Sequence, residues 1–246
     1  FNMKKNLKKN ITQIFYAILA ALVIRSFLFE PFSIPSGSMY PNLKVGDYLF
    51  VSKYSYGFSR HSLPLSLPLI PDRIFYKQPN RGDIVVFKTP EDNRTDYIKR
   101  LIGLPGDKIS MKSNQLFING EKIKTKFLKN EKYKFLDVTR VKEQLPNNKT
   151  YDVYEFEKTF IDMNTNDFAE VEVPDDNFFV VGDNRDNSQD SRYIGFIPKD
   201  NLVGRAEVVF LSFDTNIGSF LKFWTWYPAL RKDRFFVSLL PNDIVK

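Results

Sequence analysis

The hydrophobic positions of this chain form one long run near its beginning and short alternating segments after it. A largely apolar stretch extends from Ile11 to Ile24, and Phe27-Leu28-Phe29 continues it after Arg25 and Ser26. An α-helix rises about 1.5 Å per residue, so residues 11–29 would extend over roughly 28 Å. The hydrocarbon core of a bilayer is about 30 Å thick. The run therefore predicts a membrane-spanning helix, with the Arg25 side chain reaching toward the far interface.

Three interpretations of this run are open: an uncleaved anchor, a cleaved signal peptide and a buried core helix. Lysines at positions 4, 5, 8 and 9 precede it, which argues against a core helix. A cleaved signal peptide needs a small-x-small site just after the apolar stretch, whereas Ser36-Gly37-Ser38 lies too far downstream. We therefore favour an uncleaved anchor. The lysines place its N-terminus in the cytoplasm and the chain from about Glu30 on the outer side.

Beyond residue 31 the pattern changes to short β-branched and aromatic segments separated by turn residues. These predict strands at residues 47–51, 83–88, 96–102, 178–181 and 206–213. Residues 108–123 are predicted to form two short strands joined by an Asn119-Gly120 turn. Residues 58–80 are rich in Pro and Ser without a helical period, which is typical of a loop. The predicted fold class is mostly β, with an N-terminal transmembrane helix followed by a β-rich domain.

Residues 124–175 differ in composition from the rest of the chain. They are rich in Lys, Glu, Asn and Asp with scattered aromatic residues, and we expect a smaller inserted β domain or an extended hairpin. The predicted organisation is a basic stub and anchor at 1–30, a main β domain from 31–123 and 176–246, and the insertion at 124–175. Trp224, Trp226 and Tyr227 fit either the core or a membrane interface.

Composition narrows the chemistry. The 246 residues include 36 Lys and Arg against 29 Asp and Glu, a formal net charge of +7. This excess suits anionic lipid or nucleic acid, but it is dispersed and accompanies no nucleic-acid-binding motif, so no nucleic-acid partner is expected. Cysteine is absent, which excludes disulfides, thiolate metal sites and a cysteine nucleophile. His61 is the single histidine, so a Ser-His-Asp triad could use only that residue and a multi-histidine metal site is excluded. It lies in the Pro- and Ser-rich segment beside no acidic residue, and we expect an ordinary loop residue there. Neither a metal nor a cofactor is expected.

Two segments contain residues that suit nucleophilic catalysis. In residues 34–41 two serines flank a glycine between prolines, which fits either an exposed serine nucleophile beside backbone N–H groups or a plain linker. In the second segment Lys99 lies within an apolar strand, where alternation places Tyr97 and Lys99 on one face and Ile98 and Arg100 on the other. Lys99 is then either solvated or buried and neutral, as a general base must be.

A third segment, residues 182–192, is polar and rich in Asp, Asn and Ser. An EF-hand calcium loop starting at Asp186 would place Ser191 at the glycine position and Ile197 at the terminal glutamate position, so that interpretation fails. A solvated turn with local side-chain hydrogen bonds is the simpler alternative. The Ser-x-x-Lys spacing at 219–222 lacks the companion motifs of penicillin-recognising enzymes, and we attribute it to chance.

Together these segments resemble the conserved boxes of type I signal peptidases, the membrane-anchored serine proteases that remove signal peptides from exported proteins. Residues 36–43 are similar to the nucleophile box, residues 81–87 and 96–107 to the lysine boxes, and residues 182–192 to the last box. The matches follow the family order over roughly residues 31–210. They imply that the main β domain is catalytic, and they leave residues 124–175 unexplained.

The resemblance implies a Ser-Lys dyad. Ser38 would be the nucleophile and Lys99 the general base, while Ser36 Oγ and the Ser38 backbone N–H would form the oxyanion hole. Ser188 would orient Lys99. Four further polar residues would support the dyad: Asp183, Arg100, Asp190 and Arg192. Of these, Asp183 would pair with Arg100.

The resemblance also implies a substrate and a location. The partners would be preprotein signal peptides and the lipid bilayer, and the protein would be a single-pass protein of the cell inner membrane with its catalytic domain on the outer, periplasmic side. Shallow pockets would accept small residues at the first and third positions before the cut. The candidate pocket walls flank the dyad in sequence: Phe32, Ile34, Pro35, Met39, Leu43, Val86 and Ile98.

Lys99 can act as a base near neutral pH only if its pKa, ordinarily about 10.4, falls by about two to three units. Burial against Ile98 and Leu101 and the charge of Arg100 are expected to lower it. Three other functions are alternatives: a self-cleaving repressor-type Ser-Lys protein, a membrane-anchored binding module and a nucleic-acid-binding protein. The membrane span argues against the first, Lys99 in its box against the second, and the dispersed charge against the third.

Overall fold

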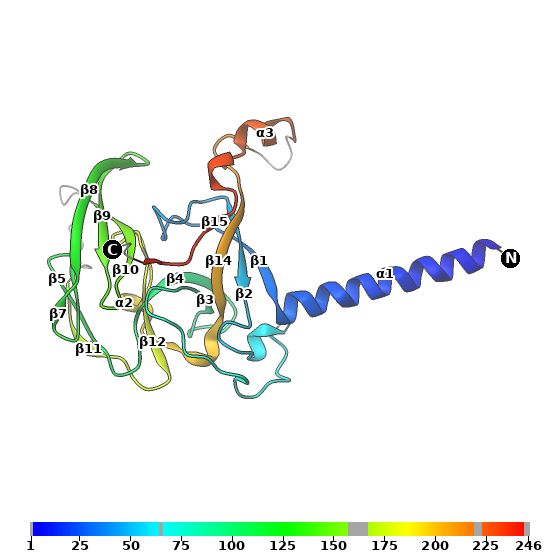
Figure 1. The fold of residues 1–246 in the computed structure, drawn as a ribbon, viewed down its shortest axis with the longest axis horizontal. Helices are drawn as coiled ribbons and strands as arrows, with labels where there is room; N and C mark the ends of the chain where they lie inside the picture. The colour runs from blue at the N-terminus through cyan, green and yellow to red at the C-terminus, as the bar shows by residue number, and fades with distance from the viewer. Residues whose placement is uncertain (1, 64–65, 157–166, 219–222, 244–246) are drawn as a thin grey trace.

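The structure is a computed structural model that describes residues 2–63, 66–156, 167–218 and 223–243. One long helix, α1 (Asn2–Phe27), projects from a body built mainly of β-strands (Figure 1). The body also contains the short helices α2 (Ser191–Ile194) and α3 (Trp226–Ala229) and the 3-10 turns η1 (Arg60–Ser62), η4 (Lys199–Asn201), η5 (Phe223–Thr225) and η6 (Lys232–Arg234). The predicted fold class, mostly β behind an N-terminal apolar helix, is confirmed.

Helix α1 contains the apolar run. Its segment Lys9–Phe27 is long and apolar enough to cross a membrane. Ile14, Phe15 and Tyr16 are each more than half exposed along it, so the helix is not the buried core helix considered above. Exposed apolar side chains over this length suit a lipid environment.

Helix α1 ends at Phe27, two residues before the end of the predicted span. Phe29 instead begins strand β1 (Phe29–Ser33), because Pro31 disfavours helical backbone at the residue before it. That residue, Glu30, pairs with Arg25 at the end of the helix and with the buried Lys53 of the body. Helix α1 is thus joined to the β body through ion pairs as well as through the chain.

The main sheet contains eight strands in the order β1–β2–β14–β3–β4–β12–β13, and β15 pairs with β14. The other bounds are β2 (Asp47–Ser52), β3 (Ile84–Lys88), β4 (Asp96–Gly103), β12 (Asn177–Val181), β13 (Ile197–Pro198), β14 (Leu202–Ser212) and β15 (Val237–Ser238). Strand β14 begins at Leu202, before the predicted start at residue 206. The prediction missed these first residues because Gly204 interrupts the apolar pattern. A Cβ atom at Gly204 would lie 2.4 Å from the Ser52 carbonyl oxygen, so glycine is needed for β2 and β14 to approach.

Two four-stranded sheets lie on the side of the body away from α1 (Figure 1). One has the order β16–β10–β9–β8 and the other β11–β5–β6–β7. Their strands are β5 (Lys108–Lys112), β6 (Gln115–Ile118), β7 (Glu121–Lys122), β8 (Lys124–Tyr133), β9 (Leu136–Gln144), β10 (Lys149–Phe156), β11 (Phe168–Glu172) and β16 (Asn242–Asp243). Residues 108–123 therefore form three strands rather than two, because Ser113 and Asn114, with φ of 49° and 62°, make a further tight turn.

Within residues 124–175, strands β8, β9 and β10 form a ribbon, whereas β11 pairs with β5. One apolar cluster also joins the two regions, since it contains Ile109 and Leu116 together with Val141 and Val153. The predicted boundaries of the insertion stay a prediction.

The part of β4 from Lys99 to Gly103 is buried on both faces. Leu101 packs with Phe87 and Phe178, whereas Ile102 packs in the cluster shared with β5 and β9. Removing such side chains from water stabilises a fold by about 1.5–3 kcal/mol each. The strand is therefore a rigid support for the residues it carries.

Candidate active site

The serine segment and strand β4 meet at Lys99. After β1 the chain turns through residues 36–43, while β4 pairs with β3 so that Val85 lies opposite Lys99. Lys99 Nζ lies 2.8 Å from Ser38 Oγ and 3.0 Å from the Ile98 carbonyl oxygen. Lys99 is 4% exposed and Ser38 7%. The fold thus brings together a serine and a buried lysine that are 61 positions apart.

Burial is the main reason why the pKa of Lys99 falls from 10.5 to about 8. The negative charges of Asp190 and Asp183 oppose this shift, and the positive charge of Arg192 adds to it. Arg192, rather than the predicted Arg100, therefore supplies the positive potential. An amine with a pKa near 8 is partly neutral at physiological pH and can accept a proton.

Two hydrogen-bond donors lie beside Ser38 Oγ. Ser36 Oγ is 3.4 Å from it. Among the described residues no acceptor takes the Ser38 backbone N–H, whereas the Ser38 carbonyl oxygen accepts a 3.0 Å bond from the Asn184 N–H. A backbone amide and a hydroxyl are thus both available to a negatively charged oxygen.

Residues 183 and 184 hold the serine segment from behind. Besides its backbone bond to Ser38, Asn184 donates from Nδ2 to the Gly37 carbonyl oxygen over 3.0 Å. The neighbouring Asp183 carboxylate accepts two 2.7 Å bonds from Arg100, and both side chains are almost fully buried. Asn42 Nδ2 donates a third 2.7 Å bond to the same carboxylate. Arg100, the neighbour of Lys99 in β4, is therefore bound to the segment, residues 183–184, that holds Ser38 in place.

Asp190 and Arg192 form a second buried ion pair. Arg192 donates through Nε and Nη2 to the two carboxylate oxygens, each over 2.8 Å, and the Gly182 N–H donates over 2.9 Å. Burial raises the pKa of Asp190, but Arg192 and the Gly182 N–H outweigh it and hold that pKa below its ordinary value. The carboxylate therefore stays charged close to Lys99.

Ser188 lines the same cavity as the dyad, but within the described residues no hydrogen bond joins its Oγ to Lys99 Nζ. It packs instead against Gly182, where a Cβ atom would lie 2.2 Å from Ser188 Oγ and 2.6 Å from the Ser38 carbonyl oxygen. Only glycine allows this close approach. No role was predicted for Gly182, for which the only signal was its place at the start of the polar segment.

A cavity of about 1250 Å³ opens over the dyad. Pro35 and Ile98, two of the predicted pocket walls, line it. The other candidates do not line it; four of them are buried in one apolar cluster and the last packs against that cluster: Ile34, Met39, Leu43, Val86 and Phe32. Their assignment as pocket walls stays a prediction.

The insertion contributes an aromatic wall that was not predicted. Tyr133 and Tyr154 line the cavity, and the ring of Tyr133 lies 4.9 Å from that of Tyr40. A Cβ atom at Gly37 would lie 2.0 Å from the Tyr133 hydroxyl, so the glycine between the two serines admits this ring. The only sequence signal was the presence of aromatic residues in an otherwise polar segment.

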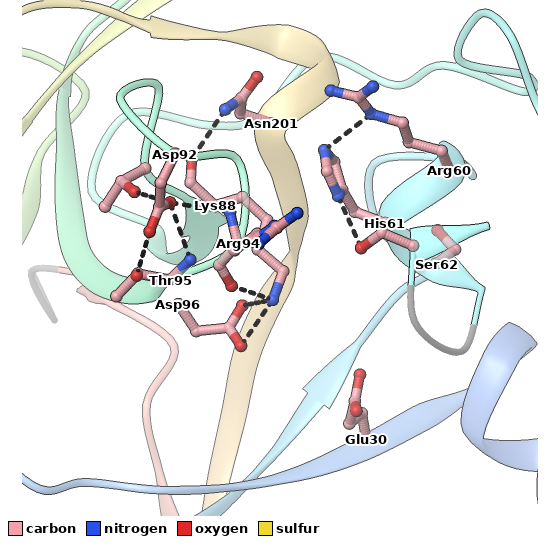
Figure 2. Close-up of polar contacts among 12 residues, drawn as sticks. Glu30, Arg60, His61, Ser62, Lys88, Asp92, Arg94, Thr95, Asp96 and Asn201 are labelled. Carbon is pink, nitrogen blue, oxygen red and sulfur yellow. Dashed lines mark hydrogen bonds and ion pairs between the residues drawn. The ribbon is translucent and has the colours of Figure 1, made fainter. Parts of the chain in front are cut away.

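His61 lies in the short 3-10 turn η1, where its side chain is buried, and it does not form a triad. Its Nε2 accepts a 3.2 Å bond from Arg60, and its Nδ1 lies 3.0 Å from Ser66 Oγ. Figure 2 shows Asp96, the first residue of β4, bonded instead to Lys88 at the end of β3. Burial and the charge of Arg60 lower the pKa of His61 to about 4. In the described part of the chain, no three His, Asp or Glu side chains gather to hold a metal ion.

The chain is similar to known proteins over most of its length. The family model described as signal peptidase, peptidase S26, matches residues 7–211, which include the serine segment, β4 and residues 182–192. The signal peptidase I of Rickettsia felis is 38% identical over 260 residues, covering 98% of this chain and 97% of its own length. That of Rickettsia typhi is 38% identical over 257 residues, covering 97% and 96%. A crystal structure of a signal peptidase I from Enterococcus faecalis V583 is 28% identical, covers 52% of this chain and 97% of its own, and has a TM-score of 0.33.

Proposed function

The chain belongs to the signal peptidase family, peptidase S26, and is a serine endopeptidase of that family; we propose that Ser38 and Lys99 are the residues with which it removes signal peptides from preproteins. The observation that carries the proposal is the 2.8 Å contact between Lys99 Nζ and Ser38 Oγ. Burial of the amine and the absence of a histidine triad in the described residues point the same way.

The geometry supports a two-step acyl transfer. Neutral Lys99 takes the Ser38 hydroxyl proton while Oγ attacks the scissile carbonyl carbon, and the Ser38 N–H and Ser36 Oγ donate to the resulting oxyanion. The C–N bond then breaks, and the Lys99 ammonium gives its proton to the leaving amine of the mature protein. Lys99 next deprotonates a water molecule that attacks the ester. Collapse of this second intermediate releases the signal peptide and returns the proton to Ser38.

The substrate class follows from the family together with the cavity beside the dyad. We propose that the segment before the cut lies between Pro35 and Ile98 and carries small side chains at its first and third positions. The aromatic ring of Tyr133 closes the cavity on the side of the insertion. One methylene group in an apolar pocket changes discrimination by only about 1–3 kcal/mol, so selection by size is expected to be graded.

The membrane places the substrate. We propose that α1 spans the inner membrane once, with its lysine-rich end in the cytoplasm and the β body on the periplasmic side. Figure 1 places α3 toward the same side of the body as the junction of α1 with β1. Trp224, just before α3, and Tyr227, within α3, are 64% and 73% exposed, so they are not core residues. Amphipathic rings of this kind favour the headgroup region, and we propose that they rest on the bilayer near the emerging signal peptide.

Cleavage of a preprotein by the purified protein in detergent tests the dyad. Ser38→Ala and Lys99→Ala should each abolish cleavage without loss of the circular dichroism of the fold. Ser33→Ala, an exposed serine at the end of β1, and His61→Gln serve as matched controls and should retain activity. Wild-type turnover by Ser38→Ala or Lys99→Ala would refute the proposed roles.

A further inference from the structure

The insertion and residues 182–192 are joined by a buried ion pair that the proposed reaction does not use. Arg185 donates through its two terminal nitrogens to the two carboxylate oxygens of Glu143, each over 2.6 Å. The side chains are 3% and 1% exposed. The Tyr151 hydroxyl donates a further 2.6 Å bond to the same carboxylate. Neither Glu143 nor Arg185 lines the cavity over the dyad.

The backbone around Arg185 links the insertion to the nucleophile. The Arg185 N–H donates to the Tyr154 carbonyl oxygen, and the Tyr154 N–H donates to the Asp183 carbonyl oxygen, each over 2.9 Å. Residue 184 therefore forms a parallel β-bridge with β10. On its other side Asn184 binds the carbonyl oxygens of Ser38 and Gly37. Residues 183–185 are thus held between the insertion and the serine segment.

Arg192 and Arg100, the two cations that support the dyad, also contact residues around the Glu143–Arg185 ion pair. Arg192 Nη2 donates a 2.7 Å bond to the Arg185 carbonyl oxygen. The Arg100 guanidinium lies over the Tyr151 ring, 4.2 Å from its centroid. A displacement of Arg185 would therefore reach the dyad along several paths, through Asn184, Arg192 and the Tyr151 ring.

We propose that Glu143 and Arg185 are positioning residues, whose ion pair fixes residues 183–185 so that the Ser38 N–H points at the developing oxyanion. The insertion then contributes to catalysis, because it holds residues 183–185, which in turn hold the nucleophile segment. This inference rests on the proposed function, because it assigns a role in the same reaction. The pair acts on the orientation of Ser38 and makes no contact with substrate.

The test compares, in the full-length protein, substitutions of Glu143 and Arg185 with a substitution of Arg140, which lies on the same strand ribbon as Glu143. Glu143→Gln should lower kcat about 10- to 100-fold, the range that displacement of a reacting group by about 1 Å produces, and leave KM within about twofold. All rates are normalised to the fraction of serine that reacts with an active-site titrant. Arg140→Gln is the control. It removes ion pairs to Asp152 and Glu131 at a partly exposed site and should leave kcat unchanged.

A second variant separates positioning from stability. A buried ion pair can be replaced by apolar side chains of similar volume with little effect on stability. The double variant Glu143→Leu/Arg185→Met should therefore recover the melting temperature lost in Glu143→Gln, while its kcat stays at least about tenfold below that of the wild type. Recovery of both melting temperature and kcat would show that the pair only stabilises the fold and would overturn the inference.

The two proposals fail in different ways. If Ser38→Ala cleaves the preprotein, the proposed function is wrong whatever the Glu143 variants do. If Ser38→Ala is inactive while Glu143→Gln retains the wild-type kcat, the dyad stands and the positioning role is refuted. An unchanged kcat with a raised KM would also refute it, because the pair would then act on binding.

Discussion

Protonation of Lys99 is expected to stop cleavage as the pH falls through about 8. Only the neutral amine can accept the Ser38 proton, and burial brings the pKa of Lys99 from 10.5 to about 8. Below that value the neutral fraction falls about tenfold per pH unit. The acid limb of kcat/KM should therefore have a slope near one and a midpoint near pH 8.

The magnitude follows from the same shift. With a pKa of about 8, roughly one-tenth of the lysine is neutral at pH 7, whereas an unperturbed pKa of 10.5 would leave about one part in three thousand. Burial thus increases the reactive fraction about 300-fold. At 1.36 kcal/mol per pH unit this corresponds to about 3 kcal/mol of differential interaction between the two protonation states.

The assay is kcat/KM for preprotein cleavage in detergent from pH 6 to pH 10. His61→Gln is the matched control, since it removes the single histidine, and its limb should coincide with that of the wild type. Arg192→Gln should move the midpoint to higher pH, because Arg192 lowers the pKa of Lys99 while Asp190 raises it. A flat profile, or a limb that disappears with His61, would refute the assignment of Lys99 as the base.

Other expectations follow from the same structure. Lys99→Met should raise the free energy of unfolding at pH 7 by up to about 3 kcal/mol, and this gain should vanish toward pH 10.5. The reason is that between pH 8 and 10.5 the unfolded chain binds more protons at Lys99 than the folded protein does. Denaturant titration at pH 7 and at pH 10.5 checks this. Gly182→Ala should abolish cleavage while preserving the far-UV circular dichroism, because its methyl group would meet the Ser38 carbonyl oxygen, and normal turnover would contradict the packing. A preprotein with leucine in place of alanine before the cut should be cleaved at least about tenfold more slowly, and equal rates would remove the case for small pockets. Trp224 and Trp226 are the only two tryptophans, so quenching of their fluorescence by brominated lipid, with protection from aqueous iodide, should report the interfacial placement; the opposite pattern would place them in water.

Much of the architecture could be predicted because it depends on patterns that are local in sequence. The apolar run predicted α1, and the β-branched segments predicted strands of the main sheet. The family resemblance is confirmed by the relatives. The end of α1 and the start of β14 differed from the predicted positions. In each case a single residue, Pro31 or Gly204, determines the local backbone conformation.

The rest depends on contacts between residues that are distant in sequence. Nothing near Glu143 indicates that its partner is Arg185, 42 positions away. The close contact of Gly37 is with Tyr133, which belongs to a segment without any motif. His61 was expected to be a loop residue because residues 58–80 are rich in Pro and Ser, but nothing in that segment indicated that its side chain is buried. Such contacts become visible only once the sheets are assembled.

The central claim, that Ser38 is the nucleophile activated by Lys99, is tested most directly by locating the acyl-enzyme. The protein is mixed with an activated ester of a short peptide ending in alanine, quenched in acid and mapped by mass spectrometry. Fragment ions should assign the acyl group to Ser38 itself. It should be absent in Ser38→Ala and should form at least about a hundredfold more slowly in Lys99→Ala. An acyl group on Ser36 or Ser188, or one that forms at the wild-type rate without Lys99, would contradict the account.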